Sequence, residues 1–231
     1  MISKSEEFDL LLDRFTHALR SPLTAIKGSA SLLSQADALL DADSRRELLV
    51  IINEESDRLD RAIERLLWLM RSDANRLDLE FCYTKLVKLV DAAIAKVSTQ
   101  LQNHRLKLEI PANLLIWGDY RVLTVILSYL LDNAAKYSPR NSEIVITAYH
   151  QAANLYIKIK DSGCGVVLAD LEKIFDKHYH APKVDPLCSS GAGMALAVCR
   201  AVVVAHKGAI WMESEITRGS CVTIKLPKSD Q

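Results

Sequence analysis

The sequence predicts two structural parts, an all-α helical hairpin followed by an α+β sandwich. Two long helix-period patterns fill the first part, and near Ser72 they give way to short alternating segments interleaved with apolar helices. The 231 residues, 49% of them hydrophobic, suffice for one large domain or two small ones with buried cores. We therefore expect a helical domain at residues 1–75, a linker at 76–84 and a second domain at 85–231.

Composition narrows the classes of protein that the chain can belong to. The 29 basic and 29 acidic side chains cancel, and no basic run stands out, which argues against nucleic acid or an anionic membrane as the main partner. The five cysteines are scattered without a Cys-x-x-Cys pair, as expected for reduced thiols in the cytoplasm. No apolar run approaches the roughly 20 residues that cross a bilayer. We expect a cytoplasmic chain, or the cytoplasmic part of something longer.

The first helix is predicted at about residues 5–34, where apolar residues recur at three- and four-residue steps. His17 lies two residues from both Phe15 and Leu19, so at about 100° per residue it points away from the apolar stripe and toward solvent. Pro22 lacks an N–H group and should bend the helix one turn further on. An exposed histidine on a helix is usually only surface, so the rest of the chain must decide its role.

A second long helix is predicted at about residues 45–71, with Ser44 and Glu47 spaced as a capping box at its start. Two antiparallel helices bury only one face against each other. A second copy of the chain would complete the packing, so we expect a homodimer that forms a four-helix bundle. The alternative is that these helices pack on the C-terminal half.

The C-terminal half alternates between strand and helix patterns. Residues 83–103 are predicted as a helix, and alternation of apolar residues then predicts a mostly antiparallel sheet with helices on one face. The predicted strands lie at 106–110, 144–148, 155–159, 210–212 and 222–226, and two further helices lie at 121–137 and 194–207.

Asn133 and Lys136 are the first pair that points to a nucleotide. Asn133 is a carboxamide in an otherwise apolar helix, and an amide oxygen suits Mg²⁺, which takes few protein ligands. Lys136 follows three residues later on the same face, where it could reach a phosphate. The alternative for Asn133 is a helix cap, because a Ser-Pro stop follows closely.

Two glycine-containing segments are the second indication. Asp161 precedes Gly163 and Gly165 at the end of a strand, although Asp-x-Gly-x-Gly is commonly only a turn. Gly191 and Gly193 run into a helix, whose free N–H groups favour phosphate. The irregular segment between the two, residues 174–190, is long enough for a mobile lid.

The order of these motifs resembles the ATP-binding domain of sensor histidine kinases. An asparagine in a helix, Asp-x-Gly-x-Gly, Ile-Phe-Asp-Lys, Gly-x-Gly-x-x-Leu and a closing Gly-Ser-Cys-Val strand follow one another as in that domain. The fold is shared in outline with Hsp90-type chaperones, type II topoisomerases and mismatch-repair ATPases, the GHKL group. The helical hairpin with His17 and Pro22 is similar to the dimerisation and phosphoacceptor domain of the same kinases, so the resemblance covers nearly the whole chain.

The resemblance implies a function for individual residues. His17 would be phosphorylated from ATP, and the phosphoryl group would pass to an aspartate of a response regulator. Ser21 would help to position water when that regulator is dephosphorylated. Asn133 would bind Mg²⁺, and Asp161 would accept a hydrogen bond from the adenine amine. The other residues implied around the nucleotide are Lys136, Tyr137, Gly163, Gly165, Gly191, Gly193 and Leu196.

Several positions depart from the family pattern. The family has an acid at the position of Ala18, an asparagine at the position of Tyr129, and Phe and Arg at the positions of His178 and His180. Since loss of a general base costs about 10²–10⁴ in rate, we expect slow rather than absent autophosphorylation. Two alternatives stay open: a phosphotransfer or phosphatase module with a vestigial ATP domain, and a structural dimer whose assembly is regulated by the nucleotide.

Overall fold

The computed structural model describes residues 4–35, 40–73, 78–176, 179 and 195–229, and for 4–15, 17–18 and 64–73 it describes the backbone alone. The chain divides into two compact units, Met1–Met70 and Arg71–Gln231. No helix in the described ranges is both long and apolar enough to cross a membrane.

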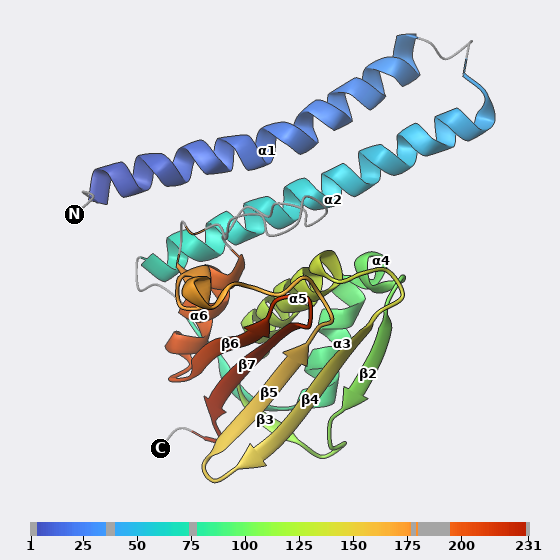
Figure 1. Ribbon diagram of the computed structural model, residues 1–231. Coiled ribbons are helices and arrows are strands. Elements are labelled where there is room, and N and C mark those ends of the chain that lie inside the picture. The colour runs from blue at the N-terminus through green and yellow to red at the C-terminus, as the bar shows by residue number, and fades with distance from the viewer. Residues whose placement is uncertain (1–3, 36–39, 74–77, 177–178, 180–194, 230–231) are drawn as a thin grey trace. The chain divides into compact units, whose positions relative to one another are not determined.

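The first unit is the predicted helical hairpin (Figure 1). Helix α1 spans Lys4–Gln35 and helix α2 spans Ala42–Asp73. Both predictions are confirmed to within three residues at each end. Pro22 is buried within α1 and does not interrupt it.

The start of α2 differs from the prediction. Asp41 is the capping residue, because its Oδ1 accepts a 2.7 Å hydrogen bond from the N–H group of Ser44. The Ser44 hydroxyl and this N–H group also lower the pKa of the Asp41 carboxyl. The predicted capping box of Ser44 and Glu47 is therefore wrong, since the helix begins at Ala42 and Ser44 already lies inside it. Asp41 and Ser44 are both residue types that cap helices well, and the Asp41 carboxylate is the one that does so here.

The second unit is built on a five-stranded sheet whose strands follow the order β2-β4-β5-β7-β6. Only the β2 and β4 pair is parallel, which confirms the predicted, mostly antiparallel sheet. The strands are β2 (Arg105–Glu109), β4 (Glu143–Gln151), β5 (Asn154–Lys160), β6 (Ala209–Glu215) and β7 (Gly219–Pro227).

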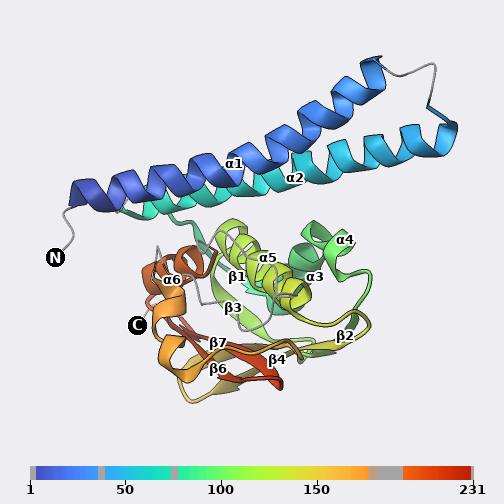
Figure 2. The same ribbon diagram turned by 45° about the horizontal axis from the view of Figure 1, so that its top comes forward.

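Helices cover one face of this sheet (Figure 2). They are α3 (Leu86–Lys96), the short α4 (Ser98–Leu101), α5 (Tyr120–Tyr137) and α6 (Ala195–Ala205). Helix α5 is central: α3 and α6 both pack against it, and nine consecutive residues from Val122 to Leu130 are buried. Two 3₁₀ turns, η1 (Leu168–Asp170) and η2 (Lys173–Phe175), lie between β5 and α6.

A second, two-stranded sheet was not predicted. Strand β1 (Phe81–Lys85) pairs antiparallel with β3 (Leu115–Asp119), so residues 81–84 of the predicted linker lie in a strand. The helix predicted from Tyr83 begins only at Leu86. Strand β3 shows no polar alternation, because Leu115 is 44% exposed on one face while Ile116 is buried on the other. This two-stranded sheet is formed by pairing between segments about 30 residues apart in the sequence, so local periodicity does not predict it.

Candidate nucleotide-binding site

The C-terminal turn of α5 carries three of the residues predicted around a nucleotide. Asn133, Lys136 and Tyr137 are half-buried there, whereas the preceding turns of the helix are buried on every side. The helix continues to Tyr137 and ends at Ser138, so Asn133 is not its cap. The helix-cap alternative for Asn133 is therefore wrong. Asn133 is a polar residue in an apolar helix, and it does not terminate that helix.

Asp161 directly follows β5 and is held in place by the neighbouring strand β7. Its Oδ1 accepts hydrogen bonds from the N–H groups of Gly163, at 2.8 Å, and Ser220, at 3.1 Å. Its own N–H group donates to the Ser220 carbonyl at 2.9 Å. The side chain is only 9% exposed. None of the hydrogen bonds within the described part of the chain goes to Oδ2.

The glycines after Asp161 bring this loop against the end of α5. A Cβ atom at Gly163 would lie 2.6 Å from the Tyr137 carbonyl oxygen, so only glycine fits. The next N–H group, of Cys164, donates to the same carbonyl at 3.3 Å. Gly165 has a φ of 75° and lies against the Glu215 carbonyl, a conformation that other residues rarely adopt. The structure thus brings Asp161 and the Asn133 end of α5 together.

The surroundings of Asp161 act on its charge in opposite directions. Burial raises the pKa of its carboxyl, and the N–H groups of Gly163 and Ser220 partly offset this by stabilising the charged form. The net effect is a pKa above the ordinary value, because two hydrogen bonds to one oxygen do not compensate for loss of water. A hydrogen-bond donor arriving at Oδ2 would lower this pKa.

Ser220 was missed by the sequence interpretation as a residue that positions Asp161. Besides its two backbone bonds to Asp161, its hydroxyl lies 2.9 Å from that of Ser214. The adjoining Gly219 has a φ of 93° and lies against the Asp161 carbonyl. The Gly-Ser pair before an apolar strand was visible in the sequence, but its pairing with a loop some 59 residues earlier was not.

The remaining predicted residues are only partly described. Leu196 is half-buried in the first turn of α6. Gly191, Gly193, His178 and His180 lie outside the described residues, as does most of the segment predicted to be a lid. Tyr179 is described, and its hydroxyl donates to the buried Asp170, which raises the pKa of Tyr179 to about 12.

The phosphoacceptor candidates lie in the helical unit. His17 lies in α1, but its side chain and that of Ala18 are outside the described residues, so the predicted orientation toward solvent stays a prediction. Ser21, one helical turn after His17, is exposed.

The donors at the end of α5 fit a magnesium ion that keeps most of its water and phosphate ligands. The Asn133 carboxamide is half-buried and offers a neutral oxygen, the kind of ligand that Mg²⁺ accepts. Tyr129, one turn earlier, is 2% exposed and belongs to the core, so it cannot replace an asparagine as a second ligand. The residues present therefore fit an ion held by one protein oxygen and by its nucleotide.

Two family models match the chain. The model described as Histidine kinase-, DNA gyrase B-, and HSP90-like ATPase matches residues 118–230. The model described as His Kinase A (phospho-acceptor) domain matches residues 9–75. Together they cover most of the chain, in the order that this family uses. The chain belongs to the sensor histidine kinases. It carries the catalytic core of this family of ATP-dependent protein-histidine kinases.

Relatives of known sequence and structure agree with this membership. The chain is 31% identical over 219 residues to the sensor protein KdpD of Clostridium acetobutylicum. The match covers 94% of this chain and 24% of KdpD. It is 30% identical over 220 residues to the sensor protein SrrB of Staphylococcus aureus, and this match covers 93% of this chain and 37% of SrrB. The chain thus spans well under half the length of these curated relatives.

Solved structures show the same fold. The histidine kinase AdeS of Acinetobacter baumannii has a TM-score of 0.69 at 23% identity, and the match covers 92% of this chain and 98% of AdeS. The histidine kinase ThkA, solved in complex with a response regulator protein, TrrA, has a TM-score of 0.68 at 21% identity, covering 97% of this chain and 64% of that one. These likenesses confirm the predicted fold class of the sensor histidine kinase core.

Proposed function

We propose that this chain transfers the γ-phosphoryl group of ATP to His17 and then to an aspartate of a response regulator. In the first step the bond from the γ-phosphorus to the bridging oxygen breaks and a phosphorus–nitrogen bond forms at the imidazole, while ADP leaves. The ring proton goes to solvent, since Ala18 offers no carboxylate to accept it. Slow rather than absent autophosphorylation follows from that missing acid.

The Asp161 loop is the observation that carries the proposal. Its Oδ1 is fixed by two N–H groups, and none of the described donors reaches Oδ2, which is left to accept a hydrogen bond from the adenine amine. Gly163 and Cys164 tie the loop to Tyr137. These contacts support a single site made of the Asp161 carboxylate, as the proposed reader of the base, and the polar end of α5.

The polar end of α5 has the chemistry that the phosphates require. Asn133 would hold Mg²⁺ through its amide oxygen, and Lys136 would contact a phosphate as a point charge. When bound, Mg²⁺ neutralises charge that develops on the transferring phosphoryl group. The glycines Gly191 and Gly193 and the side chain of Leu196 would complete the enclosure around ATP.

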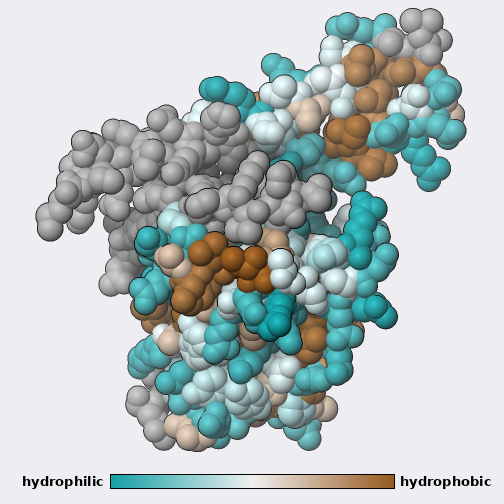
Figure 3. Space-filling view, viewed as in Figure 1, coloured by the Kyte–Doolittle hydropathy of each residue, from teal (hydrophilic) through white to brown (hydrophobic). Residues whose placement is uncertain are grey.

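The helical unit supports a homodimer that presents His17. Leu32, Leu49 and Val50 are between 47% and 54% exposed near the loop end of the hairpin, where Figure 3 shows apolar residues gathered on the surface. Exposed apolar residues gathered at one end of a two-helix unit indicate a partner. A second copy of the hairpin would bury them in a four-helix bundle.

A second candidate function is favoured by two departures from the family pattern. Tyr129 is buried where the family has an asparagine, and Ala18 stands where the family has an acid. A phosphotransfer or phosphatase module, with weak or absent autokinase activity, would keep His17 and Ser21 and need neither of the missing residues.

Incubation with γ-labelled ATP and Mg²⁺ separates the two functions. The kinase predicts acid-labile label on the wild type and none on His17→Ala, with full labelling of a matched control, His150→Ala, on the exposed part of β4. ATP binding without label on the wild type would favour the phosphotransfer module. A chain that neither binds ATP nor accepts phosphate at His17 would overturn both.

A further inference from the structure

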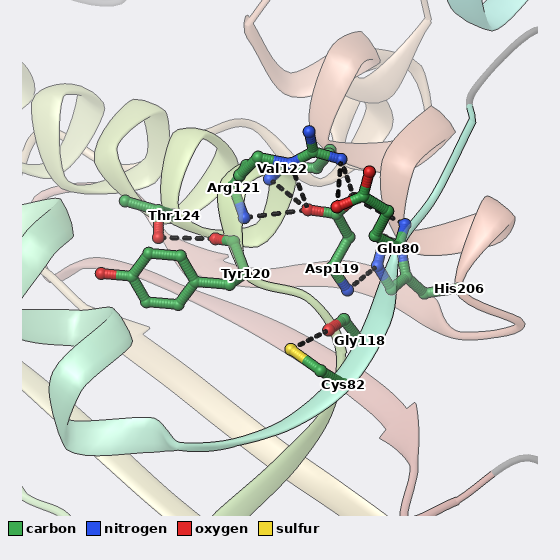
Figure 4. Close-up of polar contacts among 9 residues, drawn as sticks. All are labelled: Glu80, Cys82, Gly118, Asp119, Tyr120, Arg121, Val122, Thr124 and His206. Atoms are coloured by element: carbon green, nitrogen blue, oxygen red, sulfur yellow. Dashed lines mark hydrogen bonds and ion pairs between the residues drawn. The ribbon is translucent and has the colours of Figure 1, made fainter.

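Three segments that lie far apart in the sequence meet at Asp119 (Figure 4). The Asp119 Oδ2 accepts a 2.8 Å hydrogen bond from the N–H group of Glu80, just before β1. The Asp119 N–H group donates at 3.1 Å to the His206 Nε2, just after α6. The Oδ1 of the same carboxylate accepts from the N–H groups of Arg121 and Val122 and so caps α5. One residue thus joins the start of the second unit to two of its helices.

His206 takes part in this junction only as a neutral ring. It is 1% exposed, and its Nδ1–H donates to the Val202 carbonyl at 2.8 Å, so Nε2 must be the unprotonated nitrogen that accepts from Asp119. A proton added at Nε2 would place two donors face to face. The Phe81 ring, 4.9 Å from the imidazole, and Gly118, which has no room for a Cβ atom beside it, leave little space for the ring to turn away.

The charges around His206 do not remove this conflict. Burial lowers its pKa, and the bond to Val202 and the charge of Asp119 only partly offset that effect. The Asp119 carboxylate is itself engaged by the Arg121 guanidinium at 3.0 Å, which reduces its attraction for a second cation. The titratable and charged residues of the segments that flank the ring include Asp78, Glu80, Cys82, Tyr83, Lys85, Asp119, Tyr120, Arg121, Arg200 and Lys207.

Strand β1 depends on this junction. Among the described strands it pairs only with β3, and four of its five residues are exposed. A two-stranded ribbon is marginal by itself. Its first pair is Phe81 with Asp119, so the Glu80 bond closes the ribbon at the N-terminal end of β1. With the bond made, the chain is held from Glu80 onward, whereas α2 ends at Asp73. With the bond broken, fraying would lengthen the connection toward Lys85.

We propose that Asp119 and His206 form a proton-sensitive anchor that fixes, at Glu80, the segment of the chain between α2 and β1. With His206 neutral the anchor is closed and the connection is short. Protonation of His206 opens it and lengthens the connection. Its effect on phosphoryl transfer rests on the proposed function, because the ATP site must reach His17 across this connection, but the anchor itself can be measured without any activity.

Amide hydrogen exchange tests the anchor directly in the full chain. Relative to the core amide of Ile224, and after correction for intrinsic rates, protection of the Glu80 and Cys82 amides should fall about tenfold between about pH 7.5 and 5.5, as expected for loss of one hydrogen bond. In His206→Gln, which cannot be protonated, protection should be independent of pH. Protection that stays constant in the wild type, or that falls equally in His206→Gln, would overturn the proposal.

A matched pair of variants at Glu80 separates the backbone bond from the side chain. Glu80→Pro removes the N–H donor, and Glu80→Ala keeps it while removing the exposed ion pair with Arg121. Glu80→Pro should speed exchange at Cys82 about tenfold at pH 7.5, and Glu80→Ala should leave it unchanged. Equal behaviour of the two variants would contradict an anchor made by the N–H group.

Activity then shows what the anchor does. In Glu80→Pro the dissociation constant for ATP should stay within about twofold of the wild type, while the rate of His17 labelling changes by about threefold or more, since only the reach of the ATP site has altered. A loss of ATP affinity equal to the change in rate would instead assign the junction to the ATP site itself and overturn the proposal. If the wild type forms no phosphohistidine, the proposed kinase function fails, and hydrogen exchange alone decides on the anchor.

Discussion

Two buried aspartates lie at opposite ends of α5, and their surroundings differ in kind. Asp119, 1% exposed at the N-terminal end, uses both oxygens and accepts from three N–H groups and the Arg121 guanidinium. Asp161, 9% exposed in the loop bonded to the C-terminal end, uses Oδ1 alone. The same residue type is fully engaged at one end and half engaged at the other.

The pKa values show what this difference means. Burial raises the pKa of Asp119, but the bonds from Arg121, Glu80 and Val122 outweigh it and leave the pKa below its ordinary value. At Asp161 burial prevails, and the pKa lies above its ordinary value. Asp119 therefore stabilises the fold through its charge, whereas Asp161 carries a cost that a ligand can relieve. A satisfied carboxylate indicates structure, and an unsatisfied one indicates a binding site.

Removal of each carboxylate by substitution with alanine should give the largest difference between the two sites. Asp119→Ala leaves three N–H groups without an acceptor and removes a helix cap, so we expect a loss of about 3 kcal/mol or more in the free energy of unfolding. Asp161→Ala leaves two such groups but also removes a poorly solvated charge, so about 1 kcal/mol is expected. Urea unfolding followed by tryptophan fluorescence measures both, and equal losses would show that the two sites are alike.

An isosteric change at Asp161 should separate stability from binding. In Asp161→Asn the amide oxygen can still accept from Gly163 and Ser220, so the free energy of unfolding should be unchanged or slightly higher. Affinity for ATP should fall about 10–100-fold, because a hydrogen bond to a charged group contributes about 1.5–3 kcal/mol. Asp91→Asn, on the exposed face of α3, is the matched control. Tight binding of ATP by Asp161→Asn would remove Asp161 from the site.

The same contrast explains which parts of the fold were predictable. Strands such as 144–148 and 155–159 alternate because one face is buried and the other is partly exposed, so their periodicity identified them. Strands β1 and β3 form a sheet whose exposed face keeps large apolar residues, Tyr83 at 56% and Leu115 at 44%, so no alternation marks them. The start of α2 was misplaced because Asp41 and Ser44 are both good capping residues.

The candidate site was predictable where residue type carries the chemistry and not where geometry does. Asn133, Asp161 and the glycines stood out because each is unusual in its element. Ser220, His206 and Glu80 act through main-chain or ring atoms that contact partners 39 to 87 residues away, and no local pattern reports such contacts. The resemblance to histidine kinases implied roles for Asn133, Asp161 and the glycines, but it implied none for Ser220, His206 and Glu80.

The response to pH should distinguish the two ends of α5 by sign. Because the pKa of His206 is lowered, its contribution to stability is present above the unfolded value of about 6.5 and is lost as the pH falls below it, at no more than about 1.4 kcal/mol per pH unit. Asp161, with a raised pKa, acts the other way and destabilises less as the pH falls. We expect a loss of about 1 kcal/mol between about pH 7 and 5.5 in the wild type, and a flatter profile in His206→Gln. Identical profiles would show that His206 does not titrate in this range.

The smallest effect is expected from the partner of Asp119 that looks strongest. The Arg121 guanidinium lies 3.0 Å from Oδ2, but its side chain is 61% exposed, so water and salt screen the pair. Arg121→Gln removes this charge and keeps the Arg121 N–H group that caps α5, so the free energy of unfolding should fall by no more than about 0.5 kcal/mol and should depend little on salt. A clear loss at low salt that disappears at high salt would mean that the ion pair, and not the three N–H groups, keeps the Asp119 charge stable in a buried place. In that case the difference between the pKa values of Asp119 and Asp161 would depend on one surface residue. An arginine introduced beside the Asp161 loop would then be expected to lower the pKa of Asp161 as well.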